Sequence, residues 1–174
     1  YYPIEWICSW MTDVLITINR EDFTRAKKWL HAKRIKYVPG VGVDVEKFAS
    51  CLVNKEKKCR ELGISKNQFI LLSVGELQEN KNQSVVIEAL NRLKAQDICY
   101  LIVGKGHLEK VYEKRIEECN LSNNVKLLGF REDVNELYAI ADCFIHPSFR
   151  EGLPVAIMEA IPFSMVISNC VSTL

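Results

Sequence analysis

Short apolar runs alternate with amphipathic segments throughout the part of the chain that follows residue 68. The run 69–74 (Phe-Ile-Leu-Leu-Ser-Val) ends at Gly75, as expected of a strand buried on both faces. The segment 82–95 instead places Val86, Leu90 and Leu93 on one face at helical spacing. The same patterns predict strands at 69–74, 98–103, 125–128, 143–146 and 165–168, with helices at 82–95, 107–120, 134–140 and from near Leu153.

Strands that alternate with helices form parallel sheets, since each crossover returns the chain to the same end of the sheet. We therefore expect an α/β fold, a Rossmann-like parallel sheet with helices on both faces. Ligands of such folds bind at the carboxyl ends of the strands. Gly75, Gly104, Gly129 and the loop 147–152 all follow predicted strands. These four segments are expected to gather at the binding edge.

The first fifty residues form a separate pattern. Its predicted elements are a strand at 13–18, a helix at 21–32 and a strand at 35–38 that leads into a Pro-Gly turn. A charged stretch, 54–60, follows and is expected to cover the junction with the larger unit. We therefore predict two domains, 1–50 and 51–174.

Composition narrows the function classes only slightly. Apolar residues make up 48% and charged residues 26% of the 174 positions, enough for a buried core, and the net charge of +1 offers no argument for a nucleic-acid partner. The seven cysteines form no C-x-x-C pair, and several lie in apolar runs. We expect small buried thiols in a reducing, cytoplasmic compartment. The three histidines lack metal-ligand spacing, so no metal site is predicted.

No secretory signal is visible, and no apolar run reaches the roughly 18–20 residues that span a bilayer. The sequence starts at Tyr1-Tyr2-Pro3 without a methionine. We expect it to be a fragment of a longer protein.

Glu151 and Glu159, eight positions apart, are the most informative pair in the chain. Gly152 follows the first glutamate and lets backbone approach a ligand closely, and Pro154 suits the first turn of a helix. A helix that begins near Leu153 presents N–H groups to which a phosphate can bind. Glu159 then lies on the side of the helix that faces this phosphate. Its carboxylate can accept hydrogen bonds from the adjacent hydroxyls of a ribose.

The segment Pro147-Ser148-Phe149-Arg150-Glu151-Gly152-Leu153-Pro154, followed by Met158-Glu159-Ala160, resembles the E-x7-E motif of glycosyltransferase family 4. The resemblance extends from about 13 to 167 and is closest to bacterial enzymes of capsule or exopolysaccharide synthesis. It implies a retaining enzyme of the GT-B type, with two Rossmann-like domains. Residues 1–50 would then be the end of the acceptor-side domain and the linker, and 51–174 an incomplete donor-binding domain.

The resemblance also assigns residues of the donor site. The segment from Leu72 to Leu77, continued through Asn80-Lys81-Asn82, looks like the first strand and glycine loop of the family, and Lys81 matches the lysine that holds the donor pyrophosphate. Gly129 and Phe130 match the loop that contacts the nucleotide base; Phe130 could equally pack in the core. Many members carry an arginine after the loop glycine as a second phosphate clamp, where this chain has Glu76.

A mechanism follows from the resemblance. Lys81 and the segment Gly152, Leu153, Pro154 are expected to hold the diphosphate of a nucleotide sugar, most simply a UDP-sugar, and Glu159 the ribose. Glu151 is expected to be the catalytic residue, facing the anomeric carbon of the donor sugar. The sugar would pass to a glycan or lipid-linked acceptor with retention. No Asp-x-Asp motif occurs, so we expect no metal and no other cofactor.

Three alternatives stay open. The chain could be an inactive remnant that only binds a nucleotide or a protein partner. It could be a nicotinamide-dependent oxidoreductase, but the segment 104–109 matches only the start of G-x-G-x-x-G and has Glu109 at the third glycine position. The basic, aromatic segment 20–36 could touch the inner face of a membrane peripherally. A solvated helix with its aromatic residues in the core is the favoured interpretation of that segment.

Overall fold

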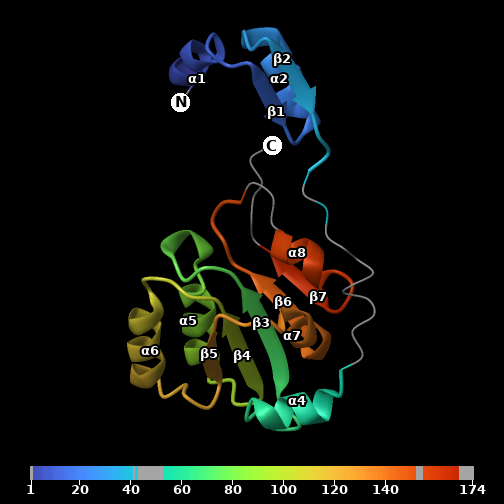
Figure 1. Cartoon of the computed structure of the whole chain (residues 1–174). Coiled ribbons are helices and arrows are strands. Elements are labelled where there is room, and N and C mark those ends of the chain that lie inside the picture. Colours follow the sequence, from blue (N-terminus) through green and yellow to red (C-terminus); the bar gives the residue numbers. More distant parts are fainter. Residues whose placement is uncertain (1, 41, 43–52, 152–154, 169–174) are drawn as a thin grey trace. The chain divides into compact units, whose positions relative to one another are not determined.

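The computed structural model describes residues 2–40, 42, 53–151 and 155–168. The chain divides into two compact units, 1–43 and 44–174, which we describe separately (Figure 1). Among the residues that the structure describes, no helix is both long and apolar enough to cross a bilayer.

The 1–43 unit is a small α/β element. Its helices are α1 (Tyr2–Ser9) and α2 (Arg20–Trp29), and its strands β1 (Val14–Thr17) and β2 (Arg34–Tyr37) pair in parallel. The strands and α2 were predicted to within a few residues. Helix α1 was not predicted. Asn19 immediately precedes α2, and its side chain accepts a 2.7 Å hydrogen bond from the Asp22 N–H and so caps the helix.

Two predictions for exposed or buried side chains fail in this unit. Cys8 is exposed, although the cysteines were expected to be buried. Phe23 is half-buried and packs on Tyr37 with 5.9 Å between ring centroids, but Trp29, expected in the core, is 60% exposed. The described part of this unit has only two strands, which are too few to cover every aromatic ring of the segment.

The 44–174 unit carries the predicted parallel sheet. Its strands are β3 (Phe69–Val74), β4 (Ile98–Val103), β5 (Val125–Gly129), β6 (Cys143–His146) and β7 (Met165–Ser168). Its helices are α4 (Lys55–Glu61), η1 (Glu79–Lys81, a 3-10 turn), α5 (Ser84–Leu93), α6 (Glu109–Glu118), α7 (Val134–Ile140) and α8 (Val155–Ala160).

All strand pairs of this sheet are parallel, in the order β5-β4-β3-β6-β7. The chain thus starts in the middle, moves outward to β5, and then returns to the other side of β3. The order reverses between β3 and β6. Open α/β sheets bind ligands at such a switch point, outside the carboxyl ends of the strands.

The core lies on both faces of the sheet, as the apolar runs predicted. Alternate residues of β4 show this directly: Cys99, Leu101 and Val103 belong to one buried cluster, and Tyr100 and Ile102 to the other. Helices α5 and α6 cover the second face, and α4, α7 and α8 the first (Figure 1). The prediction of a Rossmann-like sheet with helices on both faces is confirmed.

Two helices are shorter than predicted, and backbone conformation explains it. The helix expected over 82–95 is bounded by Asn82 (φ 52°) and Lys94 (φ 48°), both in the left-handed region, which a right-handed helix cannot include. The helix expected over 107–120 ends before Asn120, whose φ is 55°. The charged stretch 54–60 forms α4, capped by the Asn54 side chain on the Lys57 N–H at 2.9 Å.

Candidate active site

The candidate site lies at the switch point between β3 and β6. The loop after β3 carries Gly75 and Lys81, and the loop after β6 carries Glu151. Although 70 positions separate Lys81 from Glu151, their side chains meet, with Lys81 Nζ 2.5 Å from Glu151 Oε1. The topology therefore brings together two of the residues that the sequence singled out.

Lys81 lies at the end of η1 and is mostly enclosed, with 20% of its side chain exposed. Its aliphatic stem runs over Gly75, where an added Cβ would stand 3.5 Å from Lys81 Cε. The Lys81 side chain therefore packs against the backbone of Gly75, which has no side chain of its own.

Glu151 is also enclosed, with 13% of its side chain exposed. Burial alone would raise its pKa, but the hydrogen bonds from Lys81 and Ser148, with the positive charge of Lys81, outweigh burial and lower the pKa below its ordinary value. The carboxylate is therefore negatively charged at neutral pH, which suits a group that faces a developing positive charge.

His146 was missed by the sequence analysis, which considered histidines only as metal ligands. It is the last residue of β6, is 3% exposed, and has its Nε2 atom 3.3 Å from Glu151 Oε1. Its ring stacks on Phe144 with centroids 6.1 Å apart. Burial lowers the pKa of His146, and the nearby Lys81 adds to this, while Glu151 opposes it. The usable signal was a histidine in place of an apolar residue at the end of a buried strand.

Glu159 lies on α8 and is held by α7. The single hydrogen of the Tyr138 hydroxyl is within reach of two acceptors, Glu159 Oε2 at 3.1 Å and the Ala156 carbonyl at 3.3 Å. Tyr138 is fully buried, and burial raises the pKa of its hydroxyl, so it remains a donor. Only one carboxylate oxygen of Glu159 receives this bond, which leaves acceptor capacity for a ligand. The sequence analysis did not identify Tyr138.

The glycines after β3 and β4 pack their loops against each other. A Cβ at Gly104 would stand 2.0 Å from the Gly75 carbonyl oxygen, and a Cβ at Gly106 would stand 2.2 Å from the Leu77 carbonyl oxygen. Contact between the two backbones is therefore sufficient to require glycine at both positions.

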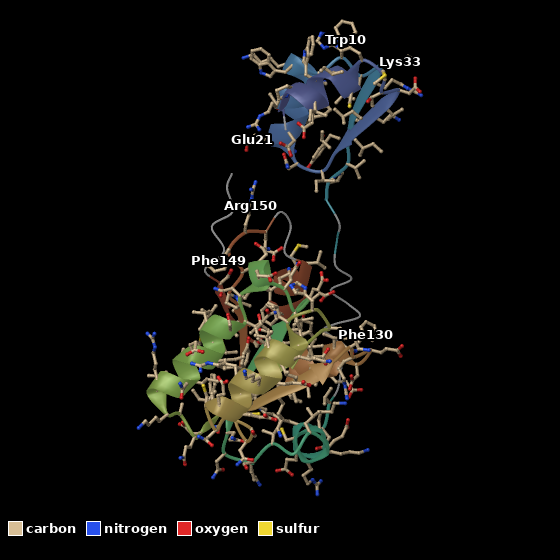
Figure 2. The ribbon with its side chains drawn as sticks, turned by 90° about the vertical axis from the view of Figure 1, so that its left-hand side faces the viewer. Trp10, Glu21, Lys33, Phe130, Phe149 and Arg150 are labelled. Carbon is tan, nitrogen blue, oxygen red and sulfur yellow. The ribbon has the colours of Figure 1, made fainter. Side chains whose placement is uncertain are left out.

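Phe130 follows β5 and is 70% exposed, so the alternative that it packs in the core is wrong. Figure 2 shows its ring projecting from the 44–174 unit. Gly129, just before it, has a φ of 64°, a conformation that favours glycine. Base contact by Gly129 and Phe130 remains a prediction.

An ionic cluster braces the loop that carries Phe130. The Arg131 guanidinium donates to both carboxylate oxygens of Asp133, at 2.7 and 2.6 Å. Lys58 on α4 is 7% exposed and pairs with Asp133 and, at 2.8 Å, with Glu136. Burial would lower the pKa of Lys58, but the carboxylates outweigh burial and raise it. The cluster thus links α4 to the loop after β5.

The remaining predictions for the site have mixed outcomes. Gly152, Leu153 and Pro154, and hence the predicted start of the helix near Leu153, lie outside the described residues. Glu76 is exposed. Among the residues that the structure describes, no group of three or more His, Cys, Asp or Glu side chains is placed to hold a metal ion.

Comparison with known proteins identifies relatives over most of the chain. The family model of glycosyl transferases group 1 matches residues 54–168. EpsD of Bacillus subtilis (strain 168), a protein assigned to the glycosyltransferases, is 36% identical over 165 residues. The UDP-Gal:alpha-D-GlcNAc-diphosphoundecaprenol alpha-1,3-galactosyltransferase of Escherichia coli is 32% identical over 167 residues. Each alignment covers 92% of this chain and 43% of the relative, so the chain spans less than half the length of these curated relatives.

Solved structures share the fold. The crystal structure of Anabaena Alr3699/HepE in complex with UDP and glucose matches with a TM-score of 0.75 at 24% identity. The match covers 91% of this chain and 45% of that chain. The α/β architecture is therefore that of the GT-B glycosyltransferases.

Proposed function

Because the chain belongs to the family of group 1 glycosyl transferases, we propose that its 44–174 unit binds a nucleotide-sugar donor. The longer protein of which such a unit is part would transfer the sugar to a glycan or a lipid-linked acceptor. The observation that carries the proposal is the meeting of Lys81 and Glu151 at the switch point of the sheet, 2.5 Å apart. A cation for a leaving diphosphate and an enclosed carboxylate for a positive sugar carbon are the two charges that the reaction requires.

The proposed donor is a UDP-sugar, within the glycosyltransferase family 4 pattern. Support comes from a relative whose name includes UDP-Gal and from a neighbour solved with UDP and glucose. Lys81 would bind the diphosphate, Glu159 the ribose hydroxyls, and Gly129 with Phe130 the base. Gly75 would let the diphosphate approach the backbone, and Gly152, Leu153 and Pro154 would complete the phosphate site.

In the proposed reaction, the bond between the anomeric carbon and the diphosphate oxygen breaks, and its electron pair leaves with the diphosphate. Lys81 neutralises the departing charge, so it must exchange its bond to Glu151 for one to the diphosphate. Glu151 then faces the sugar and stabilises positive charge at the anomeric carbon without bonding to it. The acceptor hydroxyl attacks from the same face and gives its proton to the departing diphosphate, so configuration is retained. The mechanism uses no metal and no other cofactor.

The biological setting is also part of the proposal. A role in cell-surface polysaccharide synthesis follows from the resemblance to capsule and exopolysaccharide enzymes, and the relative that acts on a diphosphoundecaprenol-linked sugar supports a lipid-linked acceptor. Cys8, Cys59, Cys99, Cys119 and Cys143 are free thiols, in keeping with a reducing, cytoplasmic compartment.

Calorimetric titration with UDP, GDP, ADP and NAD tests the donor site directly. We expect selective binding of UDP, weakened about tenfold or more by Glu159→Ala because hydrogen bonds to a charged acceptor are lost. Preference for NAD would support the oxidoreductase alternative. A folded chain that binds none of the four would favour the remnant alternative.

Peripheral membrane contact by the segment 20–36 is tested separately by flotation with liposomes that contain anionic lipid. Within this segment, Lys27 and Lys28 lie over the rings of Phe23 and Trp29, at 4.5 and 5.3 Å from the ring centroids. Flotation that requires anionic lipid would support the contact. Flotation that does not depend on anionic lipid would remove it from the proposal.

A further inference from the structure

Asn80 makes two hydrogen bonds to the backbone immediately before Glu151. Its carbonyl oxygen accepts a hydrogen bond from the Phe149 N–H at 2.9 Å. Its side-chain Nδ2 donates to the Arg150 carbonyl oxygen at 2.7 Å. That carbonyl belongs to the peptide bond that joins Arg150 to Glu151. Asn80 therefore binds two backbone groups just before Glu151, the N–H of Phe149 and the carbonyl of Arg150.

Neighbouring residues extend this contact along both loops. The Asn82 side chain donates to the Pro147 carbonyl oxygen at 3.3 Å, and Lys81 pairs with Glu151. The loop after β3 also has hydrogen bonds of its own, from the Lys81 N–H to the Gln78 carbonyl and from the Asn82 N–H to the Glu79 carbonyl, at 3.0 and 3.2 Å. A hydrogen-bonded three-residue turn therefore supports the loop that carries the carboxylate.

Side-chain burial contributes little to holding this part of the second loop. Phe149 is 65% exposed and Arg150 is exposed, and Figure 2 shows both side chains projecting outward. Apolar burial stabilises only what it removes from water. Residues 149–150 are therefore positioned mainly by hydrogen bonds to their backbone, and Asn80 makes two of these, one with its own carbonyl and one with its side chain.

We propose that Asn80 is a positioning residue that places the Glu151 carboxylate against Lys81 and His146, where it can face the donor sugar. The inference rests on the proposed function for the identity of the ligand, whereas the contacts of Asn80 with Phe149 and Arg150 do not depend on that function. Asn80 acts through the peptide of Arg150 and does not itself contact the reacting atoms. An asparagine is required because the Arg150 carbonyl needs a donor, which aspartate and alanine lack.

His146 reports the position of Glu151 without any ligand. Glu151 and Lys81 are the charged groups that face it, and Glu151 acts to raise its pKa. Proton NMR can follow its ring in a pH titration. The chain has three histidines, of which His31 and His107 are exposed. The NMR signal that disappears in His146→Asn is the signal of His146. If Asn80→Ala displaces Glu151, the pKa of His146 should fall toward the value measured in Glu151→Gln.

Asn82→Gly is the matched control. Glycine keeps the left-handed backbone at this position while removing the 3.3 Å bond to the Pro147 carbonyl and the 3.5 Å bond from the Ser84 hydroxyl, neither of which involves Arg150 or Glu151. It should leave the pKa of His146 close to that of the unmodified chain. An unchanged His146 pKa in folded Asn80→Ala would overturn the inference. Asn80→Asp, nearly identical in shape, is the second variant, and failure of both to fold would assign Asn80 a general structural role instead.

A second experiment compares the affinities of the chain for UDP and UDP-glucose. We expect Asn80→Ala to reduce the affinity for UDP-glucose relative to UDP by about two- to tenfold, the loss of one hydrogen bond. In a Glu151→Gln background the same change should have no further effect on this ratio, because Asn80 acts through Glu151. Equal losses in both backgrounds would overturn the inference. Absence of UDP binding by the unmodified chain would instead contradict the proposed function and leave the His146 result standing.

Discussion

Lys81 and Glu151 form an ion pair, with 2.5 Å between Nζ and Oε1 and little of either side chain exposed. An enclosed ion pair at a binding edge is a site in which a ligand must replace one partner. A diphosphate can replace Glu151 at Lys81, and a sugar carbon that gains positive charge can replace Lys81 at Glu151. In the proposed function, the pair would therefore connect donor binding to exposure of the carboxylate.

Lys81→Met should weaken UDP binding about tenfold or more, because the diphosphate loses its charged donor. Uridine, which has no phosphate, should bind this variant and the unmodified chain equally. Calorimetry with both ligands measures the difference. Lys114→Met on α6, where the lysine side chain is 79% exposed, is the control and should change neither affinity. Equal losses for UDP and uridine would remove Lys81 from the diphosphate site.

Tyr138→Phe should weaken UDP binding about three- to tenfold, because Glu159 loses the hydroxyl that orients its carboxylate. The matched control is Tyr112→Phe, which deletes another buried hydroxyl, bonded to Gln83 at 3.3 Å. Both variants should lose some stability, and only the first should lose affinity. Calorimetry, with thermal unfolding alongside, separates the two effects. Unchanged affinity in Tyr138→Phe would show that Glu159 is oriented without it.

The free energy of unfolding should decrease as the pH is lowered, because His146 becomes protonated. Its pKa in the folded chain is lower than in the unfolded chain, where it is about 6.5. The unfolded state therefore binds more protons below that pH, so this contribution is complete above pH 6.5 and is lost as pH falls through the folded pKa. Urea unfolding at several pH values between 7.5 and 5 measures the slope. The pKa of Glu151 is lowered from 4.5, so its contribution is lost only at lower pH.

His146→Asn should flatten this dependence between pH 7.5 and 5. His107→Asn is the control, since His107 is exposed, and it should leave the slope in place. A slope that survives in His146→Asn would assign the effect to another group.

Lys58→Met should lower the free energy of unfolding by about 2 kcal/mol, because Asp133 and Glu136 lose an enclosed partner while remaining charged. Lys66→Met removes an exposed pair with Glu56, at 3.2 Å, and should cost about 0.5 kcal/mol or less. Urea unfolding gives both values. Similar losses in the two variants would mean that the Lys58 cluster contributes no more than a surface pair.

Much of the fold could be predicted because the inner strands of the sheet are buried on both faces. The edge strand β7 has the predicted bounds although Met165 and Ile167 are exposed. The inner strands β3, β4 and β6 also have the predicted bounds, as does helix α7. A strand covered on both sides must be apolar throughout, so its ends coincide with the ends of the apolar run. Helix α1 was missed because its described side chains are largely exposed, so no buried face imposes a periodic pattern.

The candidate site was harder to predict than the sheet. Lys81, Glu151 and Glu159 were proposed from a resemblance and a spacing, and their roles remain predictions. His146, Tyr138 and Asn80 were not identified, because their importance depends on partners 5, 21 and 70 positions away along the chain. Of these three contacts, the one between Asn80 and Arg150 is set by the order of the strands, which places β3 beside β6 and which no local pattern encodes. The other two depend on how β6 leads into its own loop and on how α7 packs against α8.

The seam between β3 and β6 is short, with two residue pairs in register against six between β3 and β4. The loops that carry Lys81 and Glu151 stand on opposite sides of this seam. During synthesis, the binding edge does not exist until nearly the whole 44–174 unit has emerged and β6 has docked. A nucleotide that binds to both loops would then stabilise the pairing of β6 with β3, because it binds only the state in which the two strands are paired. Donor supply and resistance to unfolding would rise together.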